Sequence, residues 1–307
     1  MKPLTMKTTI EALKRFFETP SDPMPLGIFR ILISGFALLQ AVVWYPDWLA
    51  FFGKEGWIQW EISRALAQNW SIHIEQVYFV LHKYFGANET QTAYTLFWVY
   101  FISAFGLFMG ILTRFWGFMT WFAHYIILIS APTFTYGVDI FLHIGLFYLM
   151  VMPVNKALSL DVRLGWASPE PSWGVTLSLR VLQIHMSLAY VSAGVEKMFA
   201  PDWWNGNVLW RAVVQPDFRQ FNLFWLADYP FITMFASWFT MIAETFYCVG
   251  MWIPRVRIFW LMAMTALHLG IGLFLGLWFF GLVMILLSFS AFGYDAYLDI
   301  KAWRQQR

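Results

Sequence analysis

Lys197 is the side chain of this sequence with the clearest capacity for chemistry. It lies at the end of an apolar stretch, in the run 190–206, which reads Y-V-S-A-G-V-E-K-M-F-A-P-D-W-W-N-G. A lysine amine that aromatic rings shield from water can act as a base near neutral pH, and Trp203 and Trp204 could provide that shield. A lysine at the end of a membrane helix can also simply extend its ammonium group to the water. The residues alone leave both roles open. Glu196 would oppose the role of Lys197 as a base if it paired with the ammonium group.

Several other polar residues lie within apolar stretches. Asp139 and His143 are four residues apart, so they share one face of a helix and could hydrogen-bond. His124 and His268 lie in two further apolar stretches, and a single buried histidine can be either a satisfied core residue or part of a pocket. Because no helix carries an H-x-x-x-H or E-x-x-H pair, we predict no metal site. The polar candidates for a pocket are thus Asp139, His143 and His268, and the tryptophan-rich segment after Lys197 could roof a cavity.

Three charged residues are predicted to stabilise the packing of helices. Arg30 and Arg180 each lie about two turns from the start of an apolar stretch, and Glu244 lies about two turns from the end of another. Charges inside a membrane are costly unless they are paired. We therefore predict an ion network of Arg30, Arg180 and Glu244 at one membrane depth.

The composition excludes most soluble protein classes. Hydrophobic residues make up 60% of the 307 residues and charged residues only 12%, whereas soluble domains carry about 25% charged residues. The net charge of +2 and the lack of a basic stripe give no sign of a nucleic-acid partner. The single cysteine, Cys248, excludes an internal disulfide or a thiolate cage. The sequence predicts an integral membrane protein whose first partner is the lipid bilayer.

Runs of about 20 apolar residues can cross a bilayer as helices. We count eight such runs, so the predicted fold class is an all-α polytopic helical bundle. They cover roughly residues 25–45, 91–112, 115–131, 139–152, 174–195, 230–252, 256–275 and 277–292.

The basic residues predict the orientation of this bundle, because cytoplasmic loops are rich in lysine and arginine. Both termini are expected in the cytoplasm, which places Lys197 on the outer side. The predicted parts are a cytoplasmic segment (1–24), a membrane domain (25–292) with long outer segments at about 46–90 and 198–229, and a cytoplasmic tail (293–307). The basic residues then assigned to the cytoplasm are Lys2, Lys7, Lys14, Arg15, Arg114, Lys156, Arg163, Arg255, Arg257, Lys301, Arg304 and Arg307.

The run around Lys197 resembles the segment Y-x-x-A-G-V-x-K, followed by D-W-x-x-G, of the vitamin K-dependent γ-glutamyl carboxylases. These carboxylases are a branch of the horizontally transferred transmembrane domain (HTTM) family. The residues P-S-D-P at 20–23, with the following Leu26 and Phe29-Arg30, are similar to the family's entry into its first membrane helix. Weaker similarity covers Gly106, Gly110, Arg114, Asp139, the run 159–161 and His268. It extends from about residue 17 to about residue 291 and ends where those carboxylases continue into a large lumenal domain.

The resemblance implies a membrane enzyme of the carboxylase and epoxidase type, a lyase or oxygenase. Lys197 would be the catalytic base that deprotonates a quinol, such as reduced vitamin K or menaquinol, in an outer-facing cavity. His268 would line the pocket, and Asp139 stands at or beside the family's Asn-His pair. The expected location is a bacterial inner membrane.

Two other functions remain open from the sequence. One is a non-catalytic maturation or export factor that accompanies a secreted peptide or a separately encoded partner protein. The other is a transporter, although no pair of short, interrupted helices occurs in corresponding halves.

Overall fold

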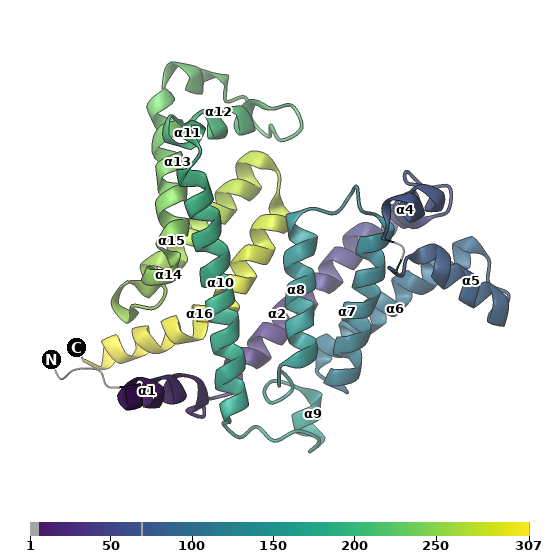
Figure 1. The fold of residues 1–307 in the computed structure, drawn as a ribbon, viewed down its shortest axis with the longest axis horizontal. Coiled ribbons are helices and arrows are strands. Elements are labelled where there is room, and N and C mark those ends of the chain that lie inside the picture. Colours follow the sequence, from purple (N-terminus) through teal and green to yellow (C-terminus); the bar gives the residue numbers. More distant parts are fainter. Residues whose placement is uncertain (1–5, 69, 307) are drawn as a thin grey trace. The chain divides into compact units, whose positions relative to one another are not determined.

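A computed structural model of the chain describes residues 6–68 and 70–306. The basic residues Lys2 and Arg307 of the predicted cytoplasmic ends lie outside these residues, as does the side chain of Lys7. The chain forms two compact units (Figure 1). The N-terminal unit is Pro20–Val175, and the C-terminal unit combines Thr176–Arg307 with Met1–Thr19.

The N-terminal unit is built on four long helices. They are α2 (Met24–Trp44), α6 (Glu89–Met109), α7 (Thr113–Ser130) and α8 (Gly137–Val151). Short elements connect α2 to α6, and one further helix follows α8. These are η1 (Tyr45–Asp47), α3 (Trp48–Phe52), α4 (Trp60–Leu66), α5 (Ile74–Phe85) and α9 (Leu160–Arg163).

Two buried charges hold the turn between α6 and α7. The Arg30 guanidinium donates to the carbonyl oxygens of Leu107 at 2.7 Å, Phe108 at 2.5 Å and Leu158 at 2.6 Å. The Asp161 carboxylate accepts from the backbone N–H groups of Leu112 at 2.7 Å and Thr113 at 3.1 Å, and from the Thr113 hydroxyl at 2.7 Å. Both charges therefore satisfy backbone groups that the ends of helices leave open.

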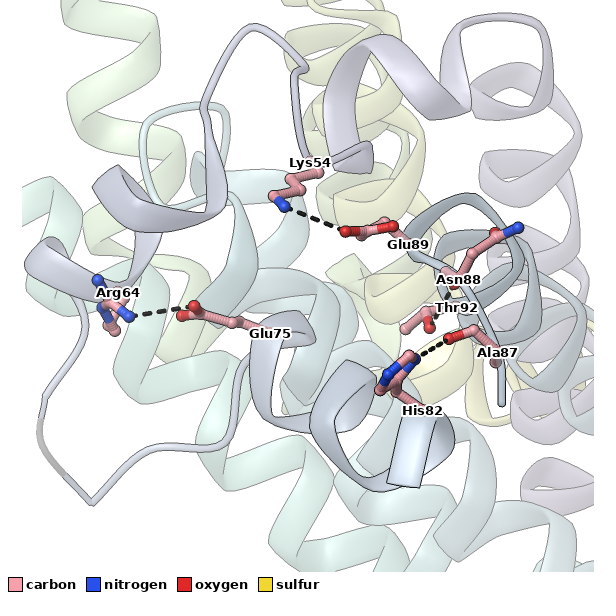
Figure 2. A network of polar contacts seen from close by, with 8 residues as sticks. All are labelled: Lys54, Arg64, Glu75, His82, Ala87, Asn88, Glu89 and Thr92. Carbon is pink, nitrogen blue, oxygen red and sulfur yellow. Dashed lines mark hydrogen bonds and ion pairs between the residues drawn. The ribbon is translucent and has the colours of Figure 1, made fainter. Parts of the chain in front are cut away.

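The segment between α3 and α6 is held by polar contacts between its short elements and α6 (Figure 2). Lys54 Nζ pairs with Glu89 Oε1 at 3.0 Å, and Arg64 Nη1 pairs with Glu75 Oε1 at 3.1 Å. His82 Nδ1 lies 3.1 Å from the carbonyl oxygen of Ala87, which closes the connection from α5 to α6.

The C-terminal unit is also helical. Its long helices are α10 (Trp173–Met198), which begins at the boundary, α13 (Pro230–Thr245), α15 (Pro254–Leu275) and α16 (Trp278–Gln305). Its shorter elements are α1 (Met6–Glu18), α11 (Pro201–Trp204), α12 (Asn207–Val214), η2 (Phe224–Asp228) and α14 (Tyr247–Gly250). Helices α15 and α16 form a hairpin whose turn contains Gly276 with a φ of 72°.

The prediction of an all-α fold is confirmed, because the described residues form helices and no strand. Each of the eight apolar runs forms a helix, although the run 230–252 breaks after Thr245 and the last helix continues to Gln305. Within residues 6–68 and 70–306, four helical stretches are long and apolar enough to cross a membrane, which indicates a membrane protein. They are Met24–Phe52, Glu89–Met109, Pro254–Leu275 and Trp278–Gln305. The count of eight spans and the cytoplasmic termini stay predictions.

We expect Asp161→Ala to destabilise the chain, because the substitution leaves the buried start of α7 without its acceptors. The loss should be about 2 to 4 kcal/mol of unfolding free energy, measured as a fall in the melting temperature of the purified protein. Asp161→Asn, which keeps one acceptor oxygen, should lose less. Equal losses from the two variants would contradict this role of the carboxylate.

His73 directly precedes α5 in the sequence and is 3% exposed. Burial is the main cause that lowers the pKa of its imidazole. The imidazole therefore binds a proton less readily in the folded chain than in the unfolded chain, where its pKa is about 6.5. The stabilisation is complete above that pH and is lost as the pH falls below it. We expect the melting temperature to fall between about pH 7 and pH 5, and His73→Gln to reduce that fall. His82→Gln, the same substitution at an exposed position, is the control for a general effect of replacing a histidine. An unaltered pH dependence in His73→Gln would be evidence against this assignment.

Candidate functional site

Lys197 lies in the last turn of α10 and forms an ion pair with Glu244. Nζ is 2.7 Å from Glu244 Oε2 and 3.3 Å from the carbonyl oxygen of Ala193. The same ammonium group lies 5.3 Å from the centre of the Trp203 ring, a distance at which an aromatic face attracts a cation. A carboxylate, a carbonyl oxygen and a ring face thus surround this side chain.

A glycine brings the two helices together at this point. A Cβ atom on Gly194 would lie 2.5 Å from the backbone nitrogen and the hydroxyl oxygen of Thr245. Only glycine therefore allows α10 and the end of α13 to approach this closely. Glu244 precedes Thr245 directly, so this contact places its carboxylate beside the next turn of α10, which carries Lys197.

The ion pair is largely buried within the protein. The Lys197 side chain is 22% exposed and the Glu244 side chain 8%. Desolvation of such a pair cancels much of its attraction, so the pair adds little net stability, but the loss of one partner leaves an uncompensated buried charge. A buried ion pair that adds little to stability is a candidate for function.

A hydrogen-bonded group of aromatic and polar residues lies in the same unit. The hydroxyl of Tyr190, seven residues before Lys197 and on the same face of α10, is 2.7 Å from His268 Nε2 on α15. The Tyr190 ring lies 4.3 Å from that of Tyr247, and both hydroxyls lie within 3.5 Å of Ser288 Oγ. His268 Nδ1 is buried and has no hydrogen-bond partner among the described residues. We refer to Lys197, Glu244, Trp203, Tyr190 and His268 as the Lys197 site.

The structure places only some of the predicted residues at this site. Trp203 contacts the lysine, whereas Trp204 donates its Nε1–H to the carbonyl oxygen of Met198 at 2.9 Å and is 49% exposed. Glu196 is exposed, so the carboxylate beside Lys197 is that of Glu244.

Within the C-terminal unit, Glu244 pairs with Lys197, and no ion pair joins it to Arg180 as the predicted network requires. Arg30 donates to carbonyl groups of its own unit, as described above. Arg180 donates to Gln183 Oε1 at 2.7 Å, and its guanidinium lies over the Phe16 ring at 4.6 Å. The prediction was wrong because it assigned depth by counting along each helix, whereas the close approach at Gly194 places the end of α13 beside the end of α10.

Asp139, His143 and His124 belong to a separate polar cluster in the N-terminal unit. Asp139 accepts from Gln40 Nε2 at 2.8 Å and from the backbone N–H of Tyr136 at 3.1 Å, not from His143 as the spacing predicted. His143 Nδ1 lies 3.2 Å from His124 Nδ1. The predicted pocket residues are therefore divided between the two units.

Sequence reasoning missed Tyr190, Tyr247 and Ser288, and it missed Glu244 as the partner of the lysine. The spacing of seven residues between Tyr190 and Lys197 was a usable signal, because it places both on one helix face. No spacing could have indicated Tyr247 or Ser288, since they reach the site from other helices.

Comparison with known proteins found no relative of this chain. Neither a family model, nor a curated protein, nor a solved structure matches the chain. The similarity to the carboxylases therefore rests on the motifs alone. No group of three or more histidine, cysteine, aspartate or glutamate side chains suited to a metal ion occurs among the residues that the structure describes.

We expect Lys197→Met to lower the unfolding free energy by about 2 kcal/mol or more, since it leaves the Glu244 carboxylate buried without a cation. The double variant Lys197→Met with Glu244→Met should recover most of this loss, because an apolar pair of similar volume needs no desolvation of charge. Melting temperatures of the two variants and the wild type measure this coupling.

The exposed ion pair of Asp202 and Arg211 provides the matched control. Asp202→Asn should cost less than about 1 kcal/mol, the usual range for surface pairs. If the double variant were less stable than Lys197→Met, the Lys197 and Glu244 charges would not be coupled in the folded protein.

Proposed function

We propose that the chain is an integral membrane enzyme similar to the membrane domain of the vitamin K-dependent γ-carboxylases, with Lys197 as a base that acts on a quinol or a lipid-like aromatic. The observation that carries this proposal is the buried Lys197–Glu244 pair at 2.7 Å beside an aromatic ring face. A charge pair in an apolar setting adds little stability, so a functional reason for it is favoured.

Two side chains of the Lys197 site support the choice of a quinol. The Trp203 ring offers a flat apolar surface, and the orphaned His268 Nδ1 offers a hydrogen-bonding partner for a hydroxyl or carbonyl group. Reduced vitamin K or menaquinol, when bound, would supply the electrons for oxygenation by O2, and carbon dioxide would be the co-substrate of a carboxylation.

The ion pair accounts for how a buried lysine can take up a proton. The ammonium can pass one proton to the Glu244 carboxylate across 2.7 Å, which leaves an uncharged amine beside an uncharged acid. The amine can then accept the proton of a quinol hydroxyl and become an ammonium again, so that the proton balance closes. Its positive charge then stabilises the oxyanion that remains. Tyr190 orients His268 through their 2.7 Å contact.

The topology that we propose has eight spans and both termini in the cytoplasm, in a bacterial inner membrane. The eight apolar runs of the sequence, each of which contains a helix among the described residues, and the distribution of basic residues support it. With this orientation the Lys197 end of α10 faces the outer side.

A second candidate is a non-catalytic maturation or export factor for a secreted peptide. It is favoured by the segment after α10, which exposes several large apolar side chains, among them Phe199 at 84%. Such side chains could bind a peptide or a separately encoded partner protein.

The test of the enzymatic proposal is the oxidation of reduced vitamin K or menaquinol by the purified protein, with the epoxide detected by mass spectrometry. We expect epoxide from the wild type and from Asp202→Asn, and at least about a hundredfold less from the Lys197→Met/Glu244→Met variant, as for loss of a general base. The double variant is used because its fold should be preserved. Absence of epoxide from all three folded proteins would favour the maturation factor, and full activity of the double variant would exclude Lys197 as the base.

A further inference from the structure

The contact between Tyr190 and His268 determines which hydrogen-bonding group the Lys197 site offers to a ligand. Tyr190 is 2% exposed and His268 is 3% exposed. The hydroxyl oxygen of Tyr190 lies 2.7 Å from His268 Nε2, so one hydrogen atom lies between these two atoms. A neutral imidazole carries its single proton on either nitrogen, and the hydrogen bond of one nitrogen decides which. The donor in this contact therefore determines whether His268 Nδ1 carries a proton.

Two arrangements of protons are compatible with this contact. In the first, the Tyr190 hydroxyl donates to a bare Nε2, and the proton of the imidazole is on Nδ1. In the second, the Nε2–H group donates to the Tyr190 oxygen, and Nδ1 is a bare acceptor. The second arrangement requires another acceptor for the hydroxyl proton of Tyr190.

The surroundings of Tyr190 provide no acceptor at a normal distance. Among the described residues, the other hydrogen-bond contact of its hydroxyl is with Ser288 Oγ at 3.4 Å, beyond the usual O–H···O distance of about 2.5 to 3.0 Å. The Tyr247 hydroxyl lies equally far from the same atom, at 3.5 Å. A buried polar group without a partner is costly. The first arrangement avoids this cost because it uses the hydroxyl proton in the short contact, so the geometry favours a proton on His268 Nδ1.

The Nδ1–H group then has no acceptor of its own. Nδ1 is buried and has no hydrogen-bond partner among the residues that the structure describes. From Pro254 to His268 the axis of α15 rises about 21 Å, at about 1.5 Å per residue, within a stretch that can cross a membrane. Bulk water does not reach the hydrocarbon core of a bilayer. At this depth the acceptor for Nδ1–H is either a bound ligand or a single internal water molecule.

The position of His268 in the Lys197 site favours the ligand. Tyr190, which holds the imidazole, and Lys197 lie seven residues apart on one face of α10. The two ends of the site differ in chemistry, because the lysine and Glu244 exchange protons, whereas His268 presents a neutral donor. A para-quinol carries two oxygens on opposite sides of one ring. One of them can lose a proton while the other accepts a hydrogen bond.

We propose that His268 donates a hydrogen bond through Nδ1–H to an acceptor oxygen of the ligand, and that Tyr190 is a positioning residue that fixes this tautomer. The identity of the ligand rests on the quinol chemistry proposed for Lys197, whereas the tautomer does not depend on it. The site then selects aromatic ligands that carry a carbonyl or an oxyanion over aromatic hydrocarbons of the same shape.

The tautomer can be measured by nitrogen NMR spectroscopy on the full-length protein in nanodiscs, with isotope-labelled histidine, because protonated and bare ring nitrogens resonate at different positions. The chain has six histidines, and His268→Gln identifies the two signals of His268 by their loss. We expect a protonated Nδ1 and a bare Nε2 in the wild type, and a mixture of tautomers in Tyr190→Phe. Tyr247→Phe removes a hydroxyl of the same group from the other side of Ser288 and should keep the wild-type tautomer. A protonated Nε2 in the wild type, or an unchanged tautomer in Tyr190→Phe, would overturn the proposal.

The ligand is tested with menaquinone, which has two carbonyl acceptors and no donor. Its addition should shift the Nδ1 resonance, whereas naphthalene, which has the rings without the oxygens, should not. We expect His268→Leu to weaken menaquinone binding, measured by quenching of tryptophan fluorescence, about tenfold, equivalent to about 1.4 kcal/mol of binding free energy. His268→Gln keeps an N–H donor and should lose less. Melting temperatures of all variants identify any loss of fold.

The outcomes separate this proposal from the enzymatic one. A protonated Nδ1 that responds to menaquinone, in a protein that forms no epoxide, would reject the enzymatic proposal and keep the donor role of His268. Epoxide formation by a protein with a bare Nδ1 would do the reverse. An Nδ1 resonance that does not respond to menaquinone, whether or not the fluorescence is quenched, would overturn the contact with the ligand and leave an internal water as the acceptor.

Discussion

A polar group in a hydrocarbon environment must find its partner within the protein, and the two units of this chain depend on that constraint. Arg30 and Asp161 meet it by binding the backbone at the turn between α6 and α7. Each charge replaces the water that would otherwise satisfy helix ends. Their burial is thereby compensated, and the turn between two apolar helices acquires one definite geometry.

The same constraint distinguishes the Lys197–Glu244 pair from those structural charges. Neither side chain caps a helix end through the backbone N–H or carbonyl groups that such ends leave open. Each is satisfied chiefly by the other, and the approach of Gly194 to Thr245 is what makes their contact possible. A pair of this kind can exchange a proton without separating charge, because transfer leaves two neutral groups. That property suits a buried base better than it suits a packing contact, for which an apolar pair would be at least as stable.

Close packing of small residues against helices determines where polar side chains meet. Lipid is as apolar as leucine, so helix association in a membrane relies on van der Waals packing and on hydrogen bonds. Gly106 accepts the Trp116 ring, and this contact lets α6 and α7 pack closely near their connecting turn. Gly194 performs the corresponding role for α10 and α13. In both places the absence of a side chain permits the contact, and at Gly194 it brings Lys197 and Glu244 together.

The sequence alone determined the helical class, the position of six of the eight apolar helices to within a few residues, and the choice of Lys197 as the main candidate side chain. These features depend on composition, on local hydrogen bonding and on capping residues close in the chain, such as Asn88 at the start of α6. The tertiary structure decided the partners. Glu244 and Lys197 are separated by 47 positions, so no periodicity relates them, and depth counted along single helices paired Glu244 with the wrong cations. Likewise, His143 faces His124 from another helix and does not face Asp139, four residues away on its own. Which side chains meet depends on how helices cross and where a glycine lets them approach, and these are properties of surfaces that only the folded chain brings together.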